Sequence, residues 1–424
     1  MSERGPEKNH GWIEALDRCA RCGKCRSVCP AFKLLQTETD VARGRISLLQ
    51  AKAEGKPISK ERLRELFYSC IKCYRCEGNC PSQVKYGQII SRMGFDYGME
   101  GFGSRMMAWL LRFMLPRRGI YDLVVKMASW LQKVFPSPKG ERIRHLPISF
   151  FHRKSIPSLA ETPALKLSSM RTCEEAESVG SVVFLFTGCL CNYVYPEMAE
   201  ATKTVLEYAG FQVRLPKEQL CCGMPLKAIG DREGAAMLAE RNMELFERYC
   251  PDWIVSPCPT CTGHLKRGYP ELWDQRALPW SERCIDMSEL LCKNSEFADR
   301  LRATRRKQRL IRITYHDPCH LLWVLENQEE PRTLLRSLAE LIEPKEGAQC
   351  CGMGGIFSAV HPLLAAEIGT RRAEELLSVD PEEIVTGCPG CILQLKERTS
   401  ARGENIPVTH TAEFIARCLL DQDS

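Results

Sequence analysis

Apolar runs and amphipathic segments alternate through the second half of the chain. Residues 182–186 form an uninterrupted apolar run of strand length, and residues 253–255 form a shorter one. Residues 311–315 and 384–385 are the equivalent strand candidates further along the chain. After the first run, apolar side chains recur at helical spacing over residues 198–209, and residues 231–249 form a second long helical segment. Strands that alternate with helices predict small α/β units with parallel sheets.

The first part of the chain has helical patterns of two kinds. Residues 45–55 and 59–67 are predicted helices. Residues 101–145 interleave apolar side chains with nine basic and two acidic ones, a net charge of +7 that predicts basic amphipathic helices. These helices could rest on an anionic membrane surface, dock a partner subunit, or pack between domains with their arginines solvated. Residues 136–163 are rich in Pro and Ser and are the best linker candidate.

Composition excludes several classes of protein. A chain of 424 residues with 44% apolar and 26% charged side chains can bury several cores, which excludes a disordered or collagen-like protein. The net charge of +6 is too small to indicate nucleic-acid binding. The polar N-terminus has no signal-peptide core, so we expect a cytoplasmic protein. The longest apolar stretch, residues 106–115, is interrupted by Arg112 and is too short for a transmembrane segment.

The 24 cysteines change this picture most. In a reducing cytosol, cysteines spaced two residues apart are ligands or redox centres rather than structural disulfides. Two runs repeat the pattern C-x2-C-x2-C-x3-C-P, which is the bacterial iron-sulfur signature, and in it the fourth cysteine binds the other run's cluster. Zinc knuckles are the alternative. The pattern predicts one cubane 4Fe-4S cluster on Cys19, Cys22, Cys25 and Cys80, and a second on Cys70, Cys73, Cys76 and Cys29.

An internal repeat with an offset of 129 to 130 residues follows. Residues 250–266 align with 380–396, and a Cys-Cys-Gly sequence occurs upstream in both copies. Each copy has five cysteines: Cys189, Cys221, Cys222, Cys258 and Cys261 in the first, and Cys319, Cys350, Cys351, Cys388 and Cys391 in the second. Because cysteines follow the strand runs, we expect them to converge at the carboxyl edge of each sheet. An opened or bridged iron-sulfur cluster, a zinc site and metal-free thiol–disulfide chemistry are the alternatives.

Several residues lie outside these patterns. The six remaining cysteines are expected to be small buried apolar residues. Cys191, two residues from Cys189, is also a candidate spare ligand or active-site thiol. His316 and His320 flank Cys319 and could hydrogen-bond a cluster sulfur, donate a proton, or serve only as structural histidines. The six are Cys173, Cys191, Cys250, Cys284, Cys292 and Cys418.

Two such cysteine runs followed by two Cys-Cys-Gly repeats resemble the iron-sulfur subunit family of glycolate and lactate oxidases, which is related to the heterodisulfide reductase catalytic subunit. The sequences "ARGRI" at residues 42–46 and "HPLLA" at 361–365 resemble the glycolate oxidase branch. The resemblance implies that each CCG domain, named for that tripeptide, binds a non-cubane 4Fe-4S cluster through its five cysteines. Both sets are complete here, whereas many glycolate-oxidase-like subunits have lost part of one.

The resemblance implies an α+β multidomain fold, with a helical two-cluster ferredoxin domain followed by two duplicated α/β CCG domains. The expected boundaries are 1–100 for the ferredoxin domain, 101–175 for the basic helical segment and linker, 176–305 for the first CCG domain and 306–424 for the second. No G-x-G-x-x-G sequence follows a strand, so we expect no flavin on this chain.

The expected function is an oxidoreductase subunit that transfers electrons within a flavin-dependent 2-hydroxyacid dehydrogenase of glycolate or lactate type. It would link a partner FAD subunit to a quinone, cytochrome or other carrier, and could lie peripherally at the inner face of the cytoplasmic membrane. It would lack an organic-substrate site of its own. The alternative is a heterodisulfide-reductase-like subunit in which one CCG cluster is the catalytic site for a thiol or disulfide.

Overall fold

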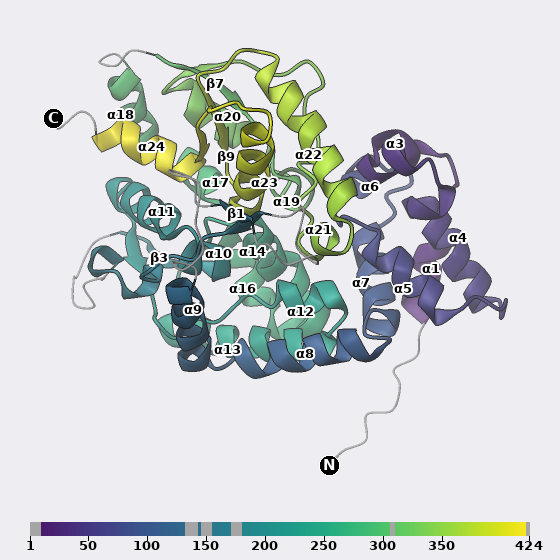
Figure 1. Cartoon of the computed structure of the whole chain (residues 1–424). Coiled ribbons are helices and arrows are strands. Elements are labelled where there is room, and N and C mark those ends of the chain that lie inside the picture. Colours follow the sequence, from purple (N-terminus) through teal and green to yellow (C-terminus); the bar gives the residue numbers. More distant parts are fainter. Residues whose placement is uncertain (1–9, 132–142, 146–154, 171–179, 306–309, 421–424) are drawn as a thin grey trace.

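The computed structural model describes residues 10–131, 143–145, 155–170, 180–305 and 310–420. A helical N-terminal lobe lies beside a larger body made of two α/β halves, and one pair of helices runs along the larger body (Figure 1). No helix among the described residues is long and apolar enough to cross a bilayer.

The N-terminal lobe is built from short helices. Its core includes Leu49, Leu63 and Ile90 from three different helices, with exposed fractions of 2% or less. Ser59 caps α5, because its side chain accepts a hydrogen bond from the Arg62 backbone N–H at 3.1 Å. The helices are α1 (His10–Asp17), α2 (Lys24–Val28), α3 (Pro30–Leu35), α4 (Ala42–Ala53), α5 (Lys60–Tyr68), α6 (Arg75–Gly78) and α7 (Tyr86–Tyr97).

The basic segment forms two helices, α8 (Phe102–Met114) and α9 (Arg118–Leu131), that run along the larger body (Figure 1). Ala108 and Leu115 pack into the core of the first α/β half. Arg112 pairs with buried Asp231 and with Glu233 of α13, which fixes α8 to that half. Of the predicted linker, residues 136–163, the structure describes 143–145 and 155–163. They include a two-stranded antiparallel ribbon of β1 (Ile143–His145) and β2 (Ser155–Pro157).

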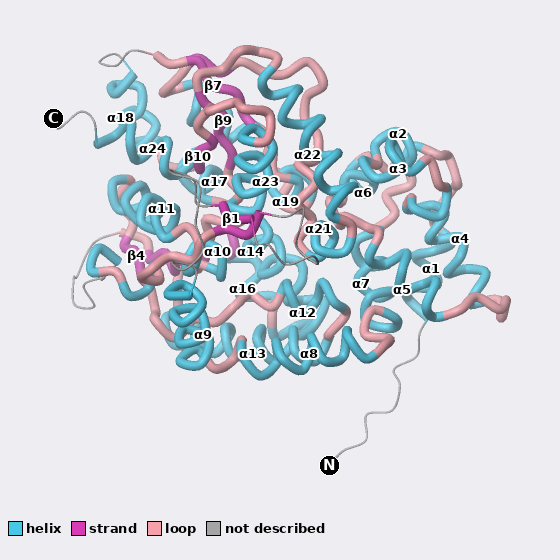
Figure 2. The backbone as a smooth tube through the Cα atoms, viewed as in Figure 1, coloured by secondary structure: helices cyan, strands magenta, loops and turns pink. Residues whose placement is uncertain are grey.

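The first α/β half has a four-stranded parallel sheet in the order β4-β3-β5-β6. The predicted apolar runs form β3 (Val182–Leu185) and β5 (Trp253–Val255). The strands of the larger body lie among helices (Figure 2). The remaining elements are β4 (Gln212–Arg214), β6 (Cys284–Ile285), α10 (Gly188–Tyr193), α11 (Pro196–Tyr208), α12 (Met224–Ile229), α13 (Arg232–Tyr249), α14 (Pro259–Gly263), a π-helical turn (His264–Gly268), α15 (Tyr269–Trp273), α16 (Leu278–Arg283), α17 (Met287–Cys292) and α18 (Ser295–Arg305).

The second half repeats the first. Its parallel sheet has the order β10-β9-β7-β8, which is the same topology read from the opposite edge. This confirms the predicted fold of duplicated α/β domains after a helical ferredoxin-like region. The elements are β7 (Arg312–Tyr315), α19 (Cys319–Trp323), α20 (Glu329–Arg336), β8 (Glu340–Leu341), α21 (Ile356–Val360), α22 (Pro362–Leu377), β9 (Glu383–Thr386), α23 (Pro389–Ser400), β10 (Val408–His410) and α24 (Thr411–Leu420).

The two halves share one core. Leu206 of α11 and Phe414 of α24 belong to the same buried cluster, and both are fully buried. Because one closely packed core joins the two halves, the carboxyl ends of β5 and β9 have fixed positions relative to each other. This shared packing brings the repeated cysteine motifs together.

Candidate functional site

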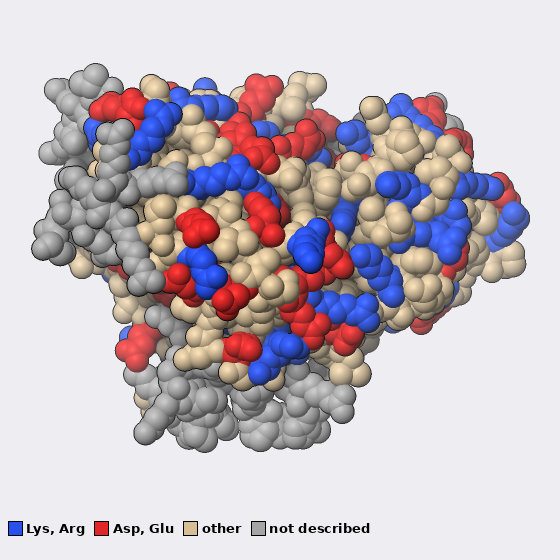
Figure 3. Space-filling model, turned by 90° about the horizontal axis from the view of Figure 1, so that it is seen from above, with Lys and Arg blue, Asp and Glu red and all other residues tan. Residues whose placement is uncertain are grey.

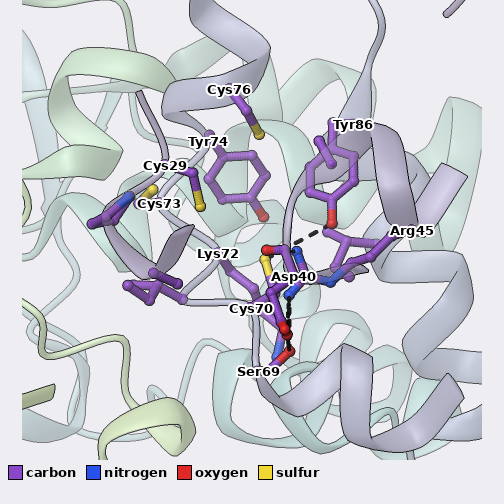
Figure 4. Close-up of a pocket in the computed structure, with 15 residues that line it drawn as sticks. Cys29, Asp40, Arg45, Ser69, Cys70, Lys72, Cys73, Tyr74, Cys76 and Tyr86 are labelled. Carbon is purple, nitrogen blue, oxygen red and sulfur yellow. Dashed lines mark hydrogen bonds and ion pairs between the residues drawn. The ribbon is translucent and has the colours of Figure 1, made fainter. Parts of the chain in front are cut away.

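One cavity in the N-terminal lobe is lined by Cys29, Cys70, Cys73 and Cys76 (Figure 4). A second cavity is lined by Cys19, Cys22, Cys25 and Cys80, and Cys76 also borders it. The fold therefore brings the fourth cysteine of each run to the other run's cavity. This is the arrangement that the two runs predicted, and the ligand role of each cysteine stays a prediction.

Both cysteine loops use left-handed backbone conformations. In the first run, Arg21 has a φ of 52° and Gly23 a φ of 84°. Lys72 and Tyr74 hold the equivalent positions of the second run, with φ values of 60° and 58°. Non-glycine residues adopt such conformations at a cost, usually at functional sites. The strained turns point three sulfurs of each run into one cavity.

A buried arginine borders the first cavity. Arg45 of α4 is 2% exposed and donates hydrogen bonds to the Leu66 carbonyl oxygen at 2.9 Å and to Ser69 Oγ at 2.9 Å. Asp40 lies 3.7 Å from the guanidinium, and Tyr86 lies beside it (Figure 4). The sequence marked Arg45 only as part of the "ARGRI" motif and gave no sign of this position.

The first CCG site lies at the carboxyl ends of β3 and β5. Cys189 follows β3, and its sulfur lies 3.5 Å from that of Cys221. Cys222 contacts Cys261, which in turn contacts Cys258 after β5. Gly223 has a φ of 96°, a conformation that glycine adopts without penalty, and this turn directs the two adjacent cysteines into the site. The five cysteines thus converge at the predicted sheet edge.

The second CCG site repeats this arrangement. Cys319 contacts Cys350, and the sulfurs of Cys351 and Cys391 lie 3.4 Å apart. Gly352 has a φ of 83°, and an added Cβ would lie 2.5 Å from the Ala365 carbonyl oxygen. Glycine is therefore required at this turn both by backbone conformation and by close packing.

The four cysteine sets lie in series. Cys73 of the ferredoxin lobe contacts Cys350 of the second CCG site. Cys388 of that site lies close enough to Cys258 of the first CCG site, across the interface between the two halves, for the two thiols to shift each other's pKa. With Cys76 bordering both ferredoxin cavities, each set adjoins the next. The order is the Cys19 set, the Cys70 set, the second CCG site and the first CCG site.

The chemistry of these sulfurs suits iron-sulfur clusters. Burial raises the pKa of Cys29 to about 12 and holds the pKa of Cys76 well above its usual range. Contact with Cys221 and burial raise the pKa of Cys189. Crowded, desolvated thiols cannot all ionise unless cations replace their protons, and thiolate donor sets bind thiophilic metals, among them the iron of iron-sulfur clusters.

The described cysteines outside the four predicted ligand sets differ in how deeply they are buried. Cys191, Cys284 and Cys418 are buried, with exposed fractions of 9% or less, and this suits the expected role of Cys284 and Cys418 as small apolar residues. Burial, together with the nearby thiols of Cys258, Cys388 and Cys189, holds the pKa of Cys191 well above its usual range, so its role as a spare ligand stays a prediction. The expectation is wrong for Cys250, which is exposed because it ends α13 in a left-handed turn with a φ of 41°. Cys292 is half-buried, and Cys173 lies outside the described residues.

Polar residues that the sequence did not single out surround the CCG sites. Arg118 and Tyr121 of α9, together with Tyr193, line a cavity beside Cys189 and Cys221. Behind the second site, Arg372 of α22 is 1% exposed and contacts His316. Aligning the two copies position by position would have marked Arg372, because the first copy has Asn242 there.

His320 joins three parts of the molecule. Its Nδ1 lies 2.9 Å from Thr260 Oγ1 of the first half, and its ring packs against Tyr74 of the ferredoxin lobe with 5.5 Å between centroids. Burial lowers its pKa to about 4, so the ring is neutral at physiological pH. This position fits a structural role at the junction.

Comparison with known families matches residues 15–84 to the 4Fe-4S dicluster domain, and residues 183–266 and 313–396 to the cysteine-rich domain CCG. A fumarate reductase (CoM/CoB) subunit from Methanothermobacter marburgensis is 29% identical over 92% of this chain and 69% of its own length. A probable glycolate oxidase iron-sulfur subunit of Bacillus subtilis is 28% identical over 94% of this chain and 93% of its own.

The glycolate oxidase iron-sulfur subunit of Escherichia coli is 27% identical over 91% of this chain and 92% of its own length. These relatives are subunits of oxidoreductases, and they span both the N-terminal lobe and the two α/β halves. The chain therefore belongs to the iron-sulfur electron-transfer proteins in which a 4Fe-4S dicluster domain precedes two cysteine-rich CCG domains.

Proposed function

We propose that this chain is the electron-transfer subunit of a flavin-dependent 2-hydroxyacid dehydrogenase of glycolate or lactate type. It receives electrons from a partner FAD subunit and passes them to a quinone, cytochrome or other carrier. The observation that supports this proposal is the series of four cysteine sets, each of which lies near the next. The two glycolate oxidase relatives support the substrate class.

Four sets of cysteines would hold the clusters, and bound clusters supply one-electron transfer. In this proposal two cubane 4Fe-4S clusters occupy the ferredoxin cavities and a non-cubane 4Fe-4S cluster occupies each CCG site. The chain's own contribution is to bury the sulfurs, to exclude water and to fix the spacing between sets. The ligands are Cys19, Cys22, Cys25 and Cys80; Cys70, Cys73, Cys76 and Cys29; Cys319, Cys350, Cys351, Cys388 and Cys391; and Cys189, Cys221, Cys222, Cys258 and Cys261.

The two ends of the series differ. At the ferredoxin end, Cys22 is exposed, as are the nearby Lys24, Arg26 and Lys33. Basic side chains gather over the N-terminal lobe (right of Figure 3). At the other end, the cavity beside Cys189 adjoins α8 and α9. A positive surface around Cys22 suits an acidic partner subunit, and α8 and α9 suit a peripheral site on the membrane.

The test is anaerobic purification of the full chain, followed by iron and acid-labile sulfide analysis and EPR. Four clusters predict about sixteen iron atoms per chain, with about four lost in Cys351→Ala. Cys284→Ala is the matched control, because its sulfur is buried and contacts the Trp280 carbonyl oxygen, and this variant should keep all the iron. Stoichiometric zinc without sulfide would contradict the proposal. The partner flavin subunit with glycolate or lactate should reduce the clusters.

A heterodisulfide-reductase-like activity is the second candidate. It is favoured by the completeness of both CCG sets, by the proximity of Cys258 and Cys388, and by the relationship to the fumarate reductase (CoM/CoB) protein. In that case a disulfide or thiol would bind at a CCG site and change its EPR signal. A panel of thiols and disulfides that leaves the CCG signals unchanged would favour pure electron transfer.

A further inference from the structure

The second CCG site has a histidine at a position where the first site has a phenylalanine. His316 follows β7 directly, is fully buried, and is replaced at the equivalent position of the first copy by Phe186, 130 residues earlier. Phe186 is also fully buried and packs with apolar neighbours. The two sites therefore have the same five cysteines but different surroundings at this position.

The imidazole of His316 is directed at the sulfurs. One of its ring nitrogens and the sulfurs of Cys351 and Cys391 all lie within 4.8 Å of one another. Its Nδ1 accepts a hydrogen bond from Arg372 Nε at 3.1 Å. Its Nε2 is buried and has no hydrogen-bond partner among the residues that the structure describes. Nε2 is thus the ring nitrogen that can interact with the sulfurs. A buried polar atom without a hydrogen-bond partner costs free energy, so an interaction there is expected.

Arg372 decides which nitrogen carries the proton. A guanidinium is always protonated and has no acceptor, so its N–H must donate to an unprotonated Nδ1. The proton of a neutral imidazole then lies on Nε2, which makes this atom a donor rather than a metal ligand. Arg372 is itself held by the Gly347 carbonyl oxygen at 2.7 Å and by Glu375 at 3.0 Å. The first copy has Asn242 at this position, which instead bonds the Cys221 carbonyl oxygen.

We propose that His316 donates a hydrogen bond from Nε2–H to the sulfurs of the second CCG site, and that this bond makes the second site easier to reduce than the first. Reduction adds negative charge to the sulfurs, so a donor and the arginine behind it stabilise the reduced state. At the equivalent positions the first site has Phe186 and Asn242, which supply neither this hydrogen-bond donor nor the positive charge of the arginine. The inference rests on the proposed iron-sulfur loading of the site and adds a difference between its two copies.

The test compares the full wild-type chain with His316→Phe, which installs the residue of the first copy, and with His316→Gln, whose side-chain amide can reach the place of Nε2–H. Iron is counted first, and redox titration is then followed by EPR, with second-site signals assigned by their loss in Cys351→Ala. Missing iron at the second site of the wild-type chain would overturn the proposed function itself, separately from the role of His316.

We expect His316→Phe to keep its iron and to shift the second-site reduction equilibrium about tenfold toward the oxidised state, equivalent to 59 mV for one electron. The reduction equilibrium of the first site should not change. In His316→Gln, the reduction equilibrium of the second site should stay within threefold of wild type. A shift of the second-site reduction equilibrium below twofold in His316→Phe would overturn the inference. If His316→Phe fails to fold, a shift of this equilibrium of tenfold or more in His316→Gln would overturn it. In protein labelled with 15N-histidine, the second-site EPR signal should show weak coupling to the histidine nitrogen. Strong coupling, as from a nitrogen bound to the metal, would assign His316 as a ligand instead.

Discussion

Arg45 carries its positive charge in an almost fully buried position beside the Cys70 cavity. Its guanidinium donates hydrogen bonds to the Leu66 carbonyl oxygen and to the Ser69 hydroxyl, and the carboxylate of Asp40 compensates its charge. These contacts join α4 to the end of α5, where the second cysteine run begins. A single side chain thus fixes the cavity wall and places a cation close to sulfurs that become anionic when they bind metal.

We predict that Arg45→Leu lowers the free energy of unfolding by about 3 kcal/mol, because Asp40 loses its buried counter-charge and Leu66 and Ser69 lose their donor. Chemical denaturation followed by circular dichroism measures this loss. Arg62→Leu is the control, since Arg62 is exposed and its pairing with Glu65 is a surface ion pair. Equal losses in both variants would show that the buried network around Arg45 adds nothing to stability.

His410 gives a pH-dependent prediction at the same scale. Burial lowers its pKa to about 4, and its Nε2 lies 2.8 Å from the Pro257 carbonyl oxygen while its Nδ1 accepts from the Ala412 N–H. A histidine with a lowered pKa in the folded state binds its proton first in the unfolded state. Its stabilising contribution is therefore complete above about pH 6.5 and is lost as the pH falls toward 4.

Between pH 7 and 5.5 the free energy of unfolding should fall by about 1 kcal/mol more in the wild-type chain than in His410→Gln. Urea denaturation at the two pH values measures the difference. His410→Gln is expected to be less stable at pH 7, since it loses part of the hydrogen bonding to Pro257. An equal pH dependence in both proteins would contradict the lowered pKa of His410.

The helices α8 and α9 expose a large apolar surface together with basic side chains. Their inner faces pack on the first α/β half, whereas their outer faces expose large apolar side chains. The exposed fractions reach 67% for Trp109, 63% for Met127 and 70% for Trp130. Together with Arg105 and Lys126, this gives a basic surface with aromatic side chains, the composition of helices that lie in a membrane interface.

We predict that the full chain sediments with vesicles that contain phosphatidylglycerol and not with neutral phosphatidylcholine vesicles. The double variant Trp109→Ser and Trp130→Ser should lower the bound fraction about tenfold, because each indole loses its burial in the interface. Leu363→Ser is the control, as it removes a side chain that is 59% exposed on α22 in the second half. If the two tryptophan changes abolish binding of the flavin partner and leave vesicle binding unchanged, the surface is assigned to a protein partner instead.

At the scale of these elements, much of the fold follows from the sequence. The apolar runs predicted the two central strands of each sheet to within one or two residues, and residues 231–249 correspond to α13 with Asp231 as its N-cap. The short edge strands β6 and β8 have two residues each and no separate apolar run, so the pattern could not show them. Their pairing depends on neighbouring strands that lie far away in the sequence.

The whole molecule depends on tight docking of the N-terminal lobe. Gly78 of α6 lies so close to Trp323 of α19 that an added Cβ would come within 2.3 Å of the indole ring. Arg75 donates a hydrogen bond to Gln349 Oε1 at 2.6 Å next to this contact. The contact between Cys73 and Cys350 lies at the same junction, so its geometry depends on this packing.

We predict that Gly78→Ala lowers the free energy of unfolding by about 1–3 kcal/mol, because the methyl group overpacks the junction. It should also weaken the magnetic interaction between the Cys70 cluster and the second CCG cluster, measured by EPR of the reduced protein. Gly119→Ala in α9 is the control, since no atom lies within 4 Å of its added Cβ. Unchanged stability and an unchanged magnetic interaction in Gly78→Ala would contradict a rigid junction.

The sequence by itself determined the cysteine runs, the repeat, the parallel α/β units and the basic helices, because local spacing and periodicity carry that information. Only the tertiary structure decided that Cys73 meets Cys350 and that Cys258 lies near Cys388, which puts the second CCG site between the ferredoxin lobe and the first CCG site. It also decided that Arg372 orients His316 toward the second site alone. These contacts join segments far apart in the chain, and they arise from the packing of whole domains, which no local pattern encodes.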